Sequence, residues 1–558
     1  MRLDGIFTND IWSKPFRLPV VSLARRSHAG DDTQAVRVFM AKAMAILVAT
    51  GLMVLAMPAK TAPPVSIPDN SAYILTPPAP ARPRINGPAV FGVRPGSPIL
   101  YHVPVTGDRP MRYSARGLPD GVRLDGATGD MTGRLAAPGT YTIMLQVRNS
   151  HGNAHRTFLL KVGDEIALTP PLGWNSYNVW GTQINQRLAL AAAHAMVSSG
   201  LIEHGWSYIN LDDGWQGLRA GPFNALQPDA ERFGDFQGMV DEIHHLGLKV
   251  GLYSTPWVKS YGGRLGGSAE NPEGSPQTWP GNPARNKHQL PYDIGKYHFA
   301  DNDAKQYAAW GIDYLKYDWG PVEYPETKEM FDALRDQRRD IVYSLSNNAA
   351  ENLLADIGQV STVANAWRTT HDIVDSWKRV SQDIGFAQTD WAPFARPGHY
   401  NDTDMLVVGV VGWGKEKQHY TRLTPDEQYS HISLWALLSS PLILGNDLEK
   451  LDPFTLSLLT NDEVLAVDQD ALVNQALPVA QTGNAIVYRK KLEDGSQAVG
   501  LFNTGEVPAN VTVKWSDIGL TGKHKVRDLW RQKNLGNLAE AFTATVAPHG
   551  VVLVHIGT

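Results

Sequence analysis

Acidic side chains stand at the ends of several apolar runs in the middle of the chain. Asp318 ends the run 312–318, and Lys316 lies two positions earlier, on the same face if the run is a strand. Four further runs end in, or lead directly into, carboxylates: Asp212 and Asp213, Asp372, Asp402 and Asp404, and Asp447. Carboxylates that meet at one place can serve as the nucleophile and general acid of glycoside hydrolysis, or as ligands of a metal ion.

Each of these aspartates, taken alone, is better explained as the N-cap of a following helix. Five strand ends that converge on one place favour a functional cluster, in which Lys316 and Arg368 could supply the balancing positive charge. A metal site is disfavoured, because the chain has no Cys and the adjacent His244 and His245 cannot face one centre from a helix. The sequence therefore favours sugar chemistry with two carboxylates, without a metal or an organic cofactor.

The region that carries these residues, 166–473, alternates apolar runs with segments of helical period, which predicts a (β/α)8 barrel. In such a barrel the active site forms at the carboxyl ends of the strands. An open doubly wound sheet is the alternative, weakened by the lack of a Gly-rich dinucleotide loop after the first run. The expected strands are 172–177, 208–211, 248–253, 312–317, 341–345, 363–367, 404–408 and 442–444. The expected helices include 183–199, 239–246, 303–310 and 328–337.

The sequence on either side of the barrel predicts four further segments. Residues 1–62 form a leader whose part at about 40–62 has the pattern of a secretory signal peptide, and Met1 or Met40 is the start. The apolar stretch is short for a membrane span, so we expect export without stable membrane insertion after cleavage. A Pro-rich linker follows at 63–71, then an Ig-like β domain at 72–165, and the chain closes with an antiparallel β-sandwich at 474–558.

Composition excludes several classes of partner and chemistry. The 558 residues carry a net charge of −5 and no basic run, which disfavours nucleic acid as a partner. The absence of Cys excludes disulfides and a thiol nucleophile. The oligomeric state is not indicated by the sequence.

Five motifs, in order along the chain, resemble those of glycoside hydrolase family 27, the melibiase group of α-galactosidases and α-N-acetylgalactosaminidases. They lie at residues 169–178, 208–215, 247–253, 313–318 and 401–406. The resemblance covers about residues 168–558 and implies a retaining glycosidase. The N-terminal β domain is similar to the Ig-like domains that often stand beside bacterial glycosidases.

The resemblance implies that Asp318 is the nucleophile and Asp372 the general acid/base of a double displacement. Retention requires the two carboxyl groups about 5–5.5 Å apart, with a covalent glycosyl-enzyme between the two steps. A nucleophile should be ionised, so we expect Lys316 to hold the pKa of Asp318 down. The acid begins protonated, so we expect Asp372 in a drier or more negative setting.

The resemblance also implies a sugar pocket in which Asp212 and Asp213 bind the 4- and 6-hydroxyls. This pair argues against arabinopyranosides, which lack the 6-hydroxyl, because a wrong sugar leaves a buried polar group unpaired. Tyr177 falls where the family usually has Trp. The other expected lining residues are Trp174, Tyr253, Lys316, Arg368, Asp404 and Met405.

The choice of sugar depends on the loop after the fifth strand. N-acetylgalactosaminidases of the family have Ser and Ala there, which leaves room for an acetamide, and Ser346 and Ala349 fall on those positions. We expect an α-galactosidase that acts on terminal α-galactosyl groups of an oligosaccharide or polysaccharide. An α-N-acetylgalactosaminidase of the same mechanism is the alternative, and a non-catalytic carbohydrate-binding barrel is the remote one.

Overall fold

A computed structural model describes residues 65–276, 293–346, 350–414 and 417–557. The predicted signal peptide at about 40–62 and the predicted site residue Ala349 therefore lie outside the described residues. In the described part of the chain, no helix is long and apolar enough to cross a membrane.

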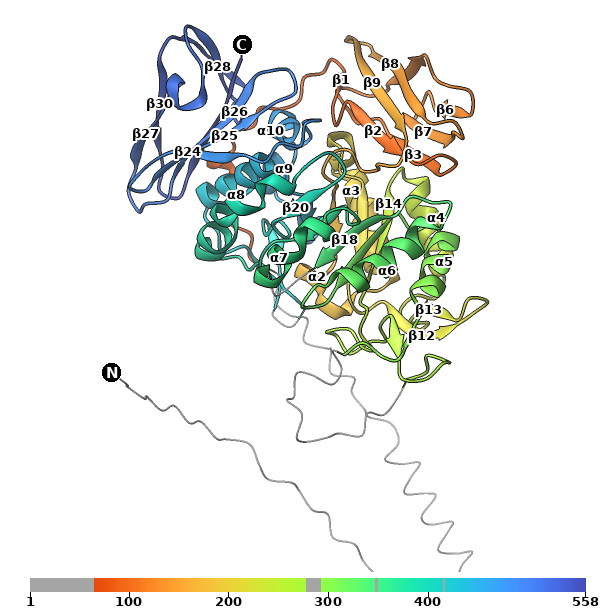
Figure 1. The fold of residues 1–558 in the computed structure, drawn as a ribbon. Helices are drawn as coiled ribbons and strands as arrows, with labels where there is room; N and C mark the ends of the chain where they lie inside the picture. The colour runs from red at the N-terminus through yellow and green to blue at the C-terminus, as the bar shows by residue number, and fades with distance from the viewer. Residues whose placement is uncertain (1–64, 277–292, 347–349, 415–416, 558) are drawn as a thin grey trace, which may run out of the picture. The chain divides into compact units, whose positions relative to one another are not determined.

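The centre of the molecule is a parallel sheet closed into a barrel, as predicted (Figure 1). Within the described residues it has eight strands in the order β20-β19-β18-β17-β14-β11-β10-β23. A bridge between Leu406 and Leu444 joins the chain after β20 to β23 and closes the circle. The strands are β10 (Leu172–Asn175), β11 (Tyr208–Leu211), β14 (Lys249–Ser254), β17 (Tyr314–Asp318), β18 (Val342–Ser346), β19 (Ala366–Arg368), β20 (Tyr400–Asp402) and β23 (Leu442–Leu444).

Helices between the strands form the outer layer of the barrel (Figure 1). Their starts follow the capping rules: the side chains of Asn185, Asp235 and Thr424 accept backbone N–H groups of the first turns. The main helices are α3 (Gln186–Ser198), α4 (Phe236–His245), α5 (Ala300–Trp310), α6 (Tyr324–Arg335), α7 (Ala350–Val360) and α8 (Pro425–Leu438). Residues 427–438 of α8 are all buried, because the C-terminal domain covers the side that would otherwise face water.

The seventh strand lies earlier than expected. The prediction placed it at 404–408, but β20 ends at Asp402, and Asp404 has a left-handed φ of 73°. The carboxylate of Asp402 accepts the N–H of Asp404 at 2.8 Å, a local turn that stops the strand. The first strand is also shorter than predicted, because Tyr177 begins the short helix α2 (Tyr177–Trp180).

Two β domains flank the barrel, as predicted. The N-terminal one packs the sheet β2-β9-β8-β5 against β3-β7-β6 around its own apolar core. The C-terminal one packs a six-stranded sheet, β24-β25-β26-β31-β28-β29, against the antiparallel pair β27-β30. The N-terminal strands are β1 (Arg84–Ile85), β2 (Val90–Val93), β3 (Pro98–His102), β4 (Val105–Thr106), β5 (Arg112–Arg116), β6 (Val122–Leu124), β7 (Asp130–Arg134), β8 (Gly139–Asn149) and β9 (Gly152–Val162). The C-terminal strands are β24 (Leu477–Thr482), β25 (Ala485–Lys491), β26 (Gln497–Asn503), β27 (Ala509–Lys514), β28 (His524–Asp528), β29 (Lys533–Leu538), β30 (Ala541–Val546) and β31 (Val551–Ile556).

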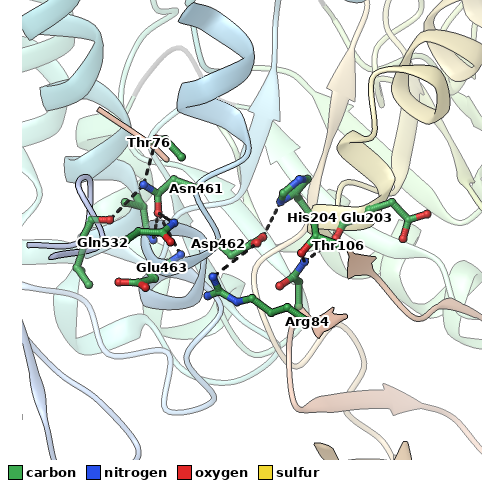
Figure 2. A network of polar contacts seen from close by, with 12 residues as sticks. Thr76, Arg84, Thr106, Glu203, His204, Asn461, Asp462, Glu463 and Gln532 are labelled. Carbon is green, nitrogen blue, oxygen red and sulfur yellow. Dashed lines mark hydrogen bonds and ion pairs between the residues drawn. The ribbon is translucent and has the colours of Figure 1, made fainter. Parts of the chain in front are cut away.

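The start of α10 (Asp462–Asp468) is a polar junction between parts of the chain that are distant in sequence (Figure 2). Asp462 contacts His204 at 2.6 Å, after α3, and Arg84 of the N-terminal domain at 4.0 Å. Asn461 donates to Thr76 at 3.1 Å and to backbone carbonyls of the C-terminal domain. The barrel is therefore attached to both β domains through one helical turn.

Candidate active site

Asp318 ends β17 at the carboxyl edge of the barrel and is 7% exposed. Its Oδ2 accepts the hydroxyl of Tyr253 at 3.1 Å, while its Oδ1 has no hydrogen-bond partner among the described residues. Burial raises the pKa of Asp318 to about 6, against the lowering effect of Lys316 and Arg368. The expected low pKa is therefore wrong in sign, because the cost of burying the charge exceeds the attraction of the two cations.

Lys316 makes its direct ion pair with Asp212, not with Asp318. Its Nζ lies 2.7 Å from Oδ2 of Asp212, and the same oxygen accepts Nδ2 of Asn175 at 2.7 Å. Burial alone would lower the pKa of Lys316, but Asp212 and Asp318 outweigh it and raise the pKa. Lys316 is thus a fixed positive charge between two strand-end carboxylates.

Asp213, the second member of the acidic pair, accepts hydrogen bonds from a loop that the sequence analysis did not predict to be part of the site. Its Oδ1 accepts the hydroxyl of Ser260 at 2.7 Å, and its Oδ2 accepts the N–H of Gly262 at 2.6 Å. Burial raises the pKa of Asp213 despite these bonds. No sequence motif predicts Ser260 or Gly262, because they lie in the long loop after β14. A loop has no periodic pattern from which the position of a side chain can be inferred.

Arg368 joins two further carboxylates at the end of β19. Its Nη1 lies 3.3 Å from Oδ2 of Asp404, and its Nη2 pairs with Asp372. The side chain of Asp372 is 67% exposed, and the adjacent Arg368 lowers its pKa. The expected drier or more negative setting for Asp372 is therefore wrong for the protein without a sugar.

These shifts place the pKa of Asp318 above that of Asp372, the reverse of the order that the roles implied by the resemblance require. A sugar bound against Asp372 would cover its exposed carboxyl, and burial raises the pKa of a carboxyl group. Substrate binding itself would thus move Asp372 toward the protonated form that an acid needs.

Most of the other predicted residues come to the same end of the barrel. Tyr177 lies with its ring centroid 5.9 Å from the ammonium of Lys316, and burial raises its pKa to about 12. Ser346 is buried at the end of β18, paired in register with Asp318. Met405 lines a cavity together with Arg368.

Trp174 and Asp447 do not join the site. Trp174 is 1% exposed, and its indole N–H donates to the carbonyl of Asn446 at 2.8 Å, so it packs in the core, and Asn175 contacts Asp212 instead. Asp447 caps a short 3-10 helix and pairs with Lys450 at 2.9 Å. For Asp447 the capping explanation is the right one.

Comparisons with known proteins agree with this geometry. The family described as "Alpha galactosidase A" matches residues 176–279 and 288–470, which contain the carboxylates of the site and the barrel strands after β10. The chain belongs to this family. The family's C-terminal β-sandwich domain matches residues 482–556, and an Ig domain family matches residues 82–163.

Relatives and solved structures extend this result. The chain is 37% identical to alpha-galactosidase 2 of Arabidopsis thaliana over 391 residues, which is 69% of this chain and 88% of the relative. It is 30% identical to alpha-galactosidase A of Cellvibrio japonicus, over 70% of this chain and 93% of that one. Alpha-galactosidase I of Mortierella vinacea superposes with a TM-score of 0.59 at 31% identity, over 70% of this chain and 97% of that one. A presumed alpha-galactosidase of Bacteroides fragilis, at 31% identity, covers 86% of this chain and 98% of its own with a TM-score of 0.75.

The pKa of Asp318 predicts the acid side of the activity profile of this glycoside hydrolase. If Asp318 is the nucleophile, as the resemblance implies, it must be ionised to attack, and kcat/KM should fall about tenfold for each pH unit below about 6. The profile of kcat/KM, measured from pH 4 to 8 with a nitrophenyl α-galactoside, reports the free enzyme. Full activity down to pH 4 would contradict the raised pKa.

Proposed function

We propose that the protein hydrolyses terminal non-reducing α-D-galactosyl groups with retention of configuration. The observation that carries the proposal is that Asp318, with one free carboxylate oxygen, and the exposed Asp372 lie at the same barrel edge, where the charges of Arg368 and Lys316 act to lower the pKa of both. Two carboxyl groups at one glycosidic bond are what this reaction needs.

In the first step Oδ1 of Asp318 attacks the anomeric carbon, and the bond from that carbon to the leaving oxygen breaks. Asp372 gives its proton to the leaving oxygen, so the departing group leaves as a neutral alcohol. In the second step Asp372 takes a proton from water, and the resulting hydroxide attacks the anomeric carbon of the galactosyl ester. Asp318 departs as a carboxylate, and both residues return to their starting protonation.

The acidic pair provides the recognition of galactose in this proposal. Asp212 and Asp213 are both 1% exposed. Their carboxylates accept bonds from Asn175, Lys316, Ser260, Gly262 and the backbone N–H of Asp213, and still have lone pairs free. Buried acceptors of this kind reject a sugar that cannot donate to them. The names of the relatives, alpha-galactosidases in a plant and a bacterium, support galactose as that sugar.

Ser346 is the observation that favours an N-acetylgalactosaminidase as the second candidate. Its side chain is small and lies beside Asp318 in the strand register, as that activity would need. Its predicted companion Ala349 lies outside the described residues. The two activities share the catalytic pair and differ in the group at the sugar's 2-position.

Hydrolysis of nitrophenyl α-galactoside and nitrophenyl α-N-acetylgalactosaminide tests the choice. We expect the galactoside to be preferred by at least about tenfold in kcat/KM, since one misfitting group in a pocket costs about 1–3 kcal/mol. Proton NMR of the first product should show the α-anomer. Preference for the acetamido sugar would select the second candidate, an initial β-anomer would refute retention, and binding without turnover would indicate a carbohydrate-binding barrel.

We also propose that the protein is exported and meets oligosaccharide or polysaccharide substrates in the periplasm or outside the cell. The support is the sequence pattern at about 40–62, with a Lys followed by a short apolar stretch and small residues. Fractionation of cells that produce the full chain, with N-terminal sequencing of the exported form, tests this proposal.

A further inference from the structure

Two buried carboxylates, Asp404 and Asp375, anchor the stretch of loop that directly follows Asp372. Asp404 accepts the backbone N–H of Ile373 through Oδ2 at 2.8 Å, directly after Asp372. Two residues further along the loop, Asp375 is 1% exposed although the residues on both sides of it are exposed. A buried carboxylate in such a loop needs partners that offset the loss of water.

The partners of Asp375 come from another part of the barrel mouth. Its Oδ1 accepts Nη1 of Arg422 at 2.7 Å, and its Oδ2 accepts the backbone N–H of the same residue at 2.9 Å. Oδ2 also lies 3.0 Å from Nε2 of His419. These contacts engage both oxygens and fix the orientation of the carboxylate.

His419 and Arg422 belong to a segment that is itself anchored near the sugar pocket. His419 lies in β22 (His419–Tyr420), which pairs with β21 (Val410–Val411). Its ring stacks on Trp413 with the centroids 6.3 Å apart. The N–H of Trp413 donates to the carbonyl of Asn178 at 3.1 Å, in the helix that begins with Tyr177. Asp375 therefore ties the Asp372 loop to a segment that contacts α2, the helix that begins with Tyr177.

We infer that Asp375 is a positioning residue for the acid/base, an inference that rests on the proposed function. Asp372 is two-thirds exposed, so the backbone on either side of it determines where its carboxyl can reach. Loss of the Asp375 anchor leaves the bond from Ile373 to Asp404 to hold this stretch, and the looser loop moves the carboxyl of Asp372 away from the glycosidic oxygen. A displacement of about 1 Å is enough to reduce proton transfer greatly.

The dependence of the rate on the leaving group separates positioning from general damage. A poor leaving group such as methoxide needs the proton of Asp372 in order to depart, whereas nitrophenolate departs with little help. A misplaced acid therefore slows methyl α-galactoside selectively, and a loosened fold or pocket slows both substrates alike. This ratio is a readout that a merely structural role of Asp375 would not change.

The test compares Asp375→Asn with a matched control, Asp313→Asn. Asp313 has the same set of partners, a His, an Arg and a backbone N–H (His244, Arg339 and Val250), but it lies at the other end of the barrel, before β17. Asp375→Asn should lower kcat/KM for methyl α-galactoside by about 10²-fold, within the range of general acid catalysis, and that for 4-nitrophenyl α-galactoside by less than about fivefold. Asp313→Asn should lower the unfolding temperature and leave the ratio of the two substrates unchanged.

Equal losses on both substrates, or no loss on either, would overturn the positioning role. Wild-type protein and Asp372→Ala complete the set. If the wild type hydrolyses neither galactoside, the proposed function fails, and the inference fails with it. If Asp372→Ala shows no leaving-group dependence, the acid/base assignment is wrong, and Asp375 has nothing to position.

Discussion

Replacing Asp318 with Asn is expected to reduce kcat/KM by at least about 10⁴-fold, the scale at which a covalent nucleophile is lost. The amide has nearly the shape of the carboxylate, but it cannot form the galactosyl ester that the proposed mechanism requires. Tyr253, which donates to Oδ2 of Asp318, retains an acceptor in the amide oxygen, so galactose should still bind. Steady-state kinetics and calorimetric binding of galactose to the same variant measure the two properties separately.

The same variant should be more stable than the wild type at neutral pH. The folded pKa of Asp318 is about 6 and its ordinary value is 3.8, so its charge opposes folding increasingly as pH rises from about 4 to 6. A shift of about two pKa units corresponds to about 3 kcal/mol, present in full above pH 6 and absent below the unfolded value. Thermal unfolding at pH 8 and at pH 3.5 should therefore show a gain for Asp318→Asn only at the higher pH.

Asp372→Asn is the matched control, because its sign is opposite. Arg368 lowers the pKa of Asp372, so the charged form favours folding, and its removal should lower stability at neutral pH. Near-normal turnover by Asp318→Asn would refute the nucleophile assignment. An equal stability change in both variants would refute the electrostatic account.

The barrel could be predicted because its strands are buried on both faces and appear as continuous apolar runs. The expected strands 208–211 and 442–444 coincide with β11 and β23. The prediction failed at 404–408, where apolar residues follow a turn made by Asp402 and the left-handed Asp404. A side chain that bonds its own backbone ends a strand without changing the hydrophobic pattern.

The sequence predicted which charged residues lie at the site, but not which of them pair with one another. Strand ends brought Asp212, Asp318 and Arg368 together as expected. Sequence proximity suggested Asp318 as the partner of Lys316, whereas the sheet brings the ammonium of Lys316 on β17 past the intervening strand β14 to Asp212 at the end of β11. The pKa of Asp318 depends on how completely the fold excludes water from the carboxyl group, and residue spacing in the sequence does not predict this burial.

Replacing Lys316 with Met should have the second large effect, on both stability and the pH profile. The ion pair with Asp212 is buried, and removal of one partner leaves the other charge uncompensated, which costs about 3–5 kcal/mol. Lys316 is also the strongest of the charges that lower the pKa of Asp318. Without it that pKa rises further above 6, so a smaller fraction of the nucleophile is ionised at pH 7.

The expected result for Lys316→Met is a loss of about 10²-fold or more in kcat/KM at pH 7, with partial recovery toward pH 9 as Asp318 ionises. Lys249→Met is the control, on the neighbouring strand β14 and at its opposite end, where burial lowers the pKa of the amine to about 8. Its ammonium lies 5.0 Å from the ring centroids of Phe91 and Tyr208, and the carboxylates that act on it are Asp313 and Asp340, not those of the active site. The Lys249→Met substitution should leave the pH dependence of kcat/KM unchanged. If the acid limb of Lys316→Met also stays near pH 6, the ionisation of Asp318 depends on burial and Arg368 alone, and Lys316 serves only to hold Asp212.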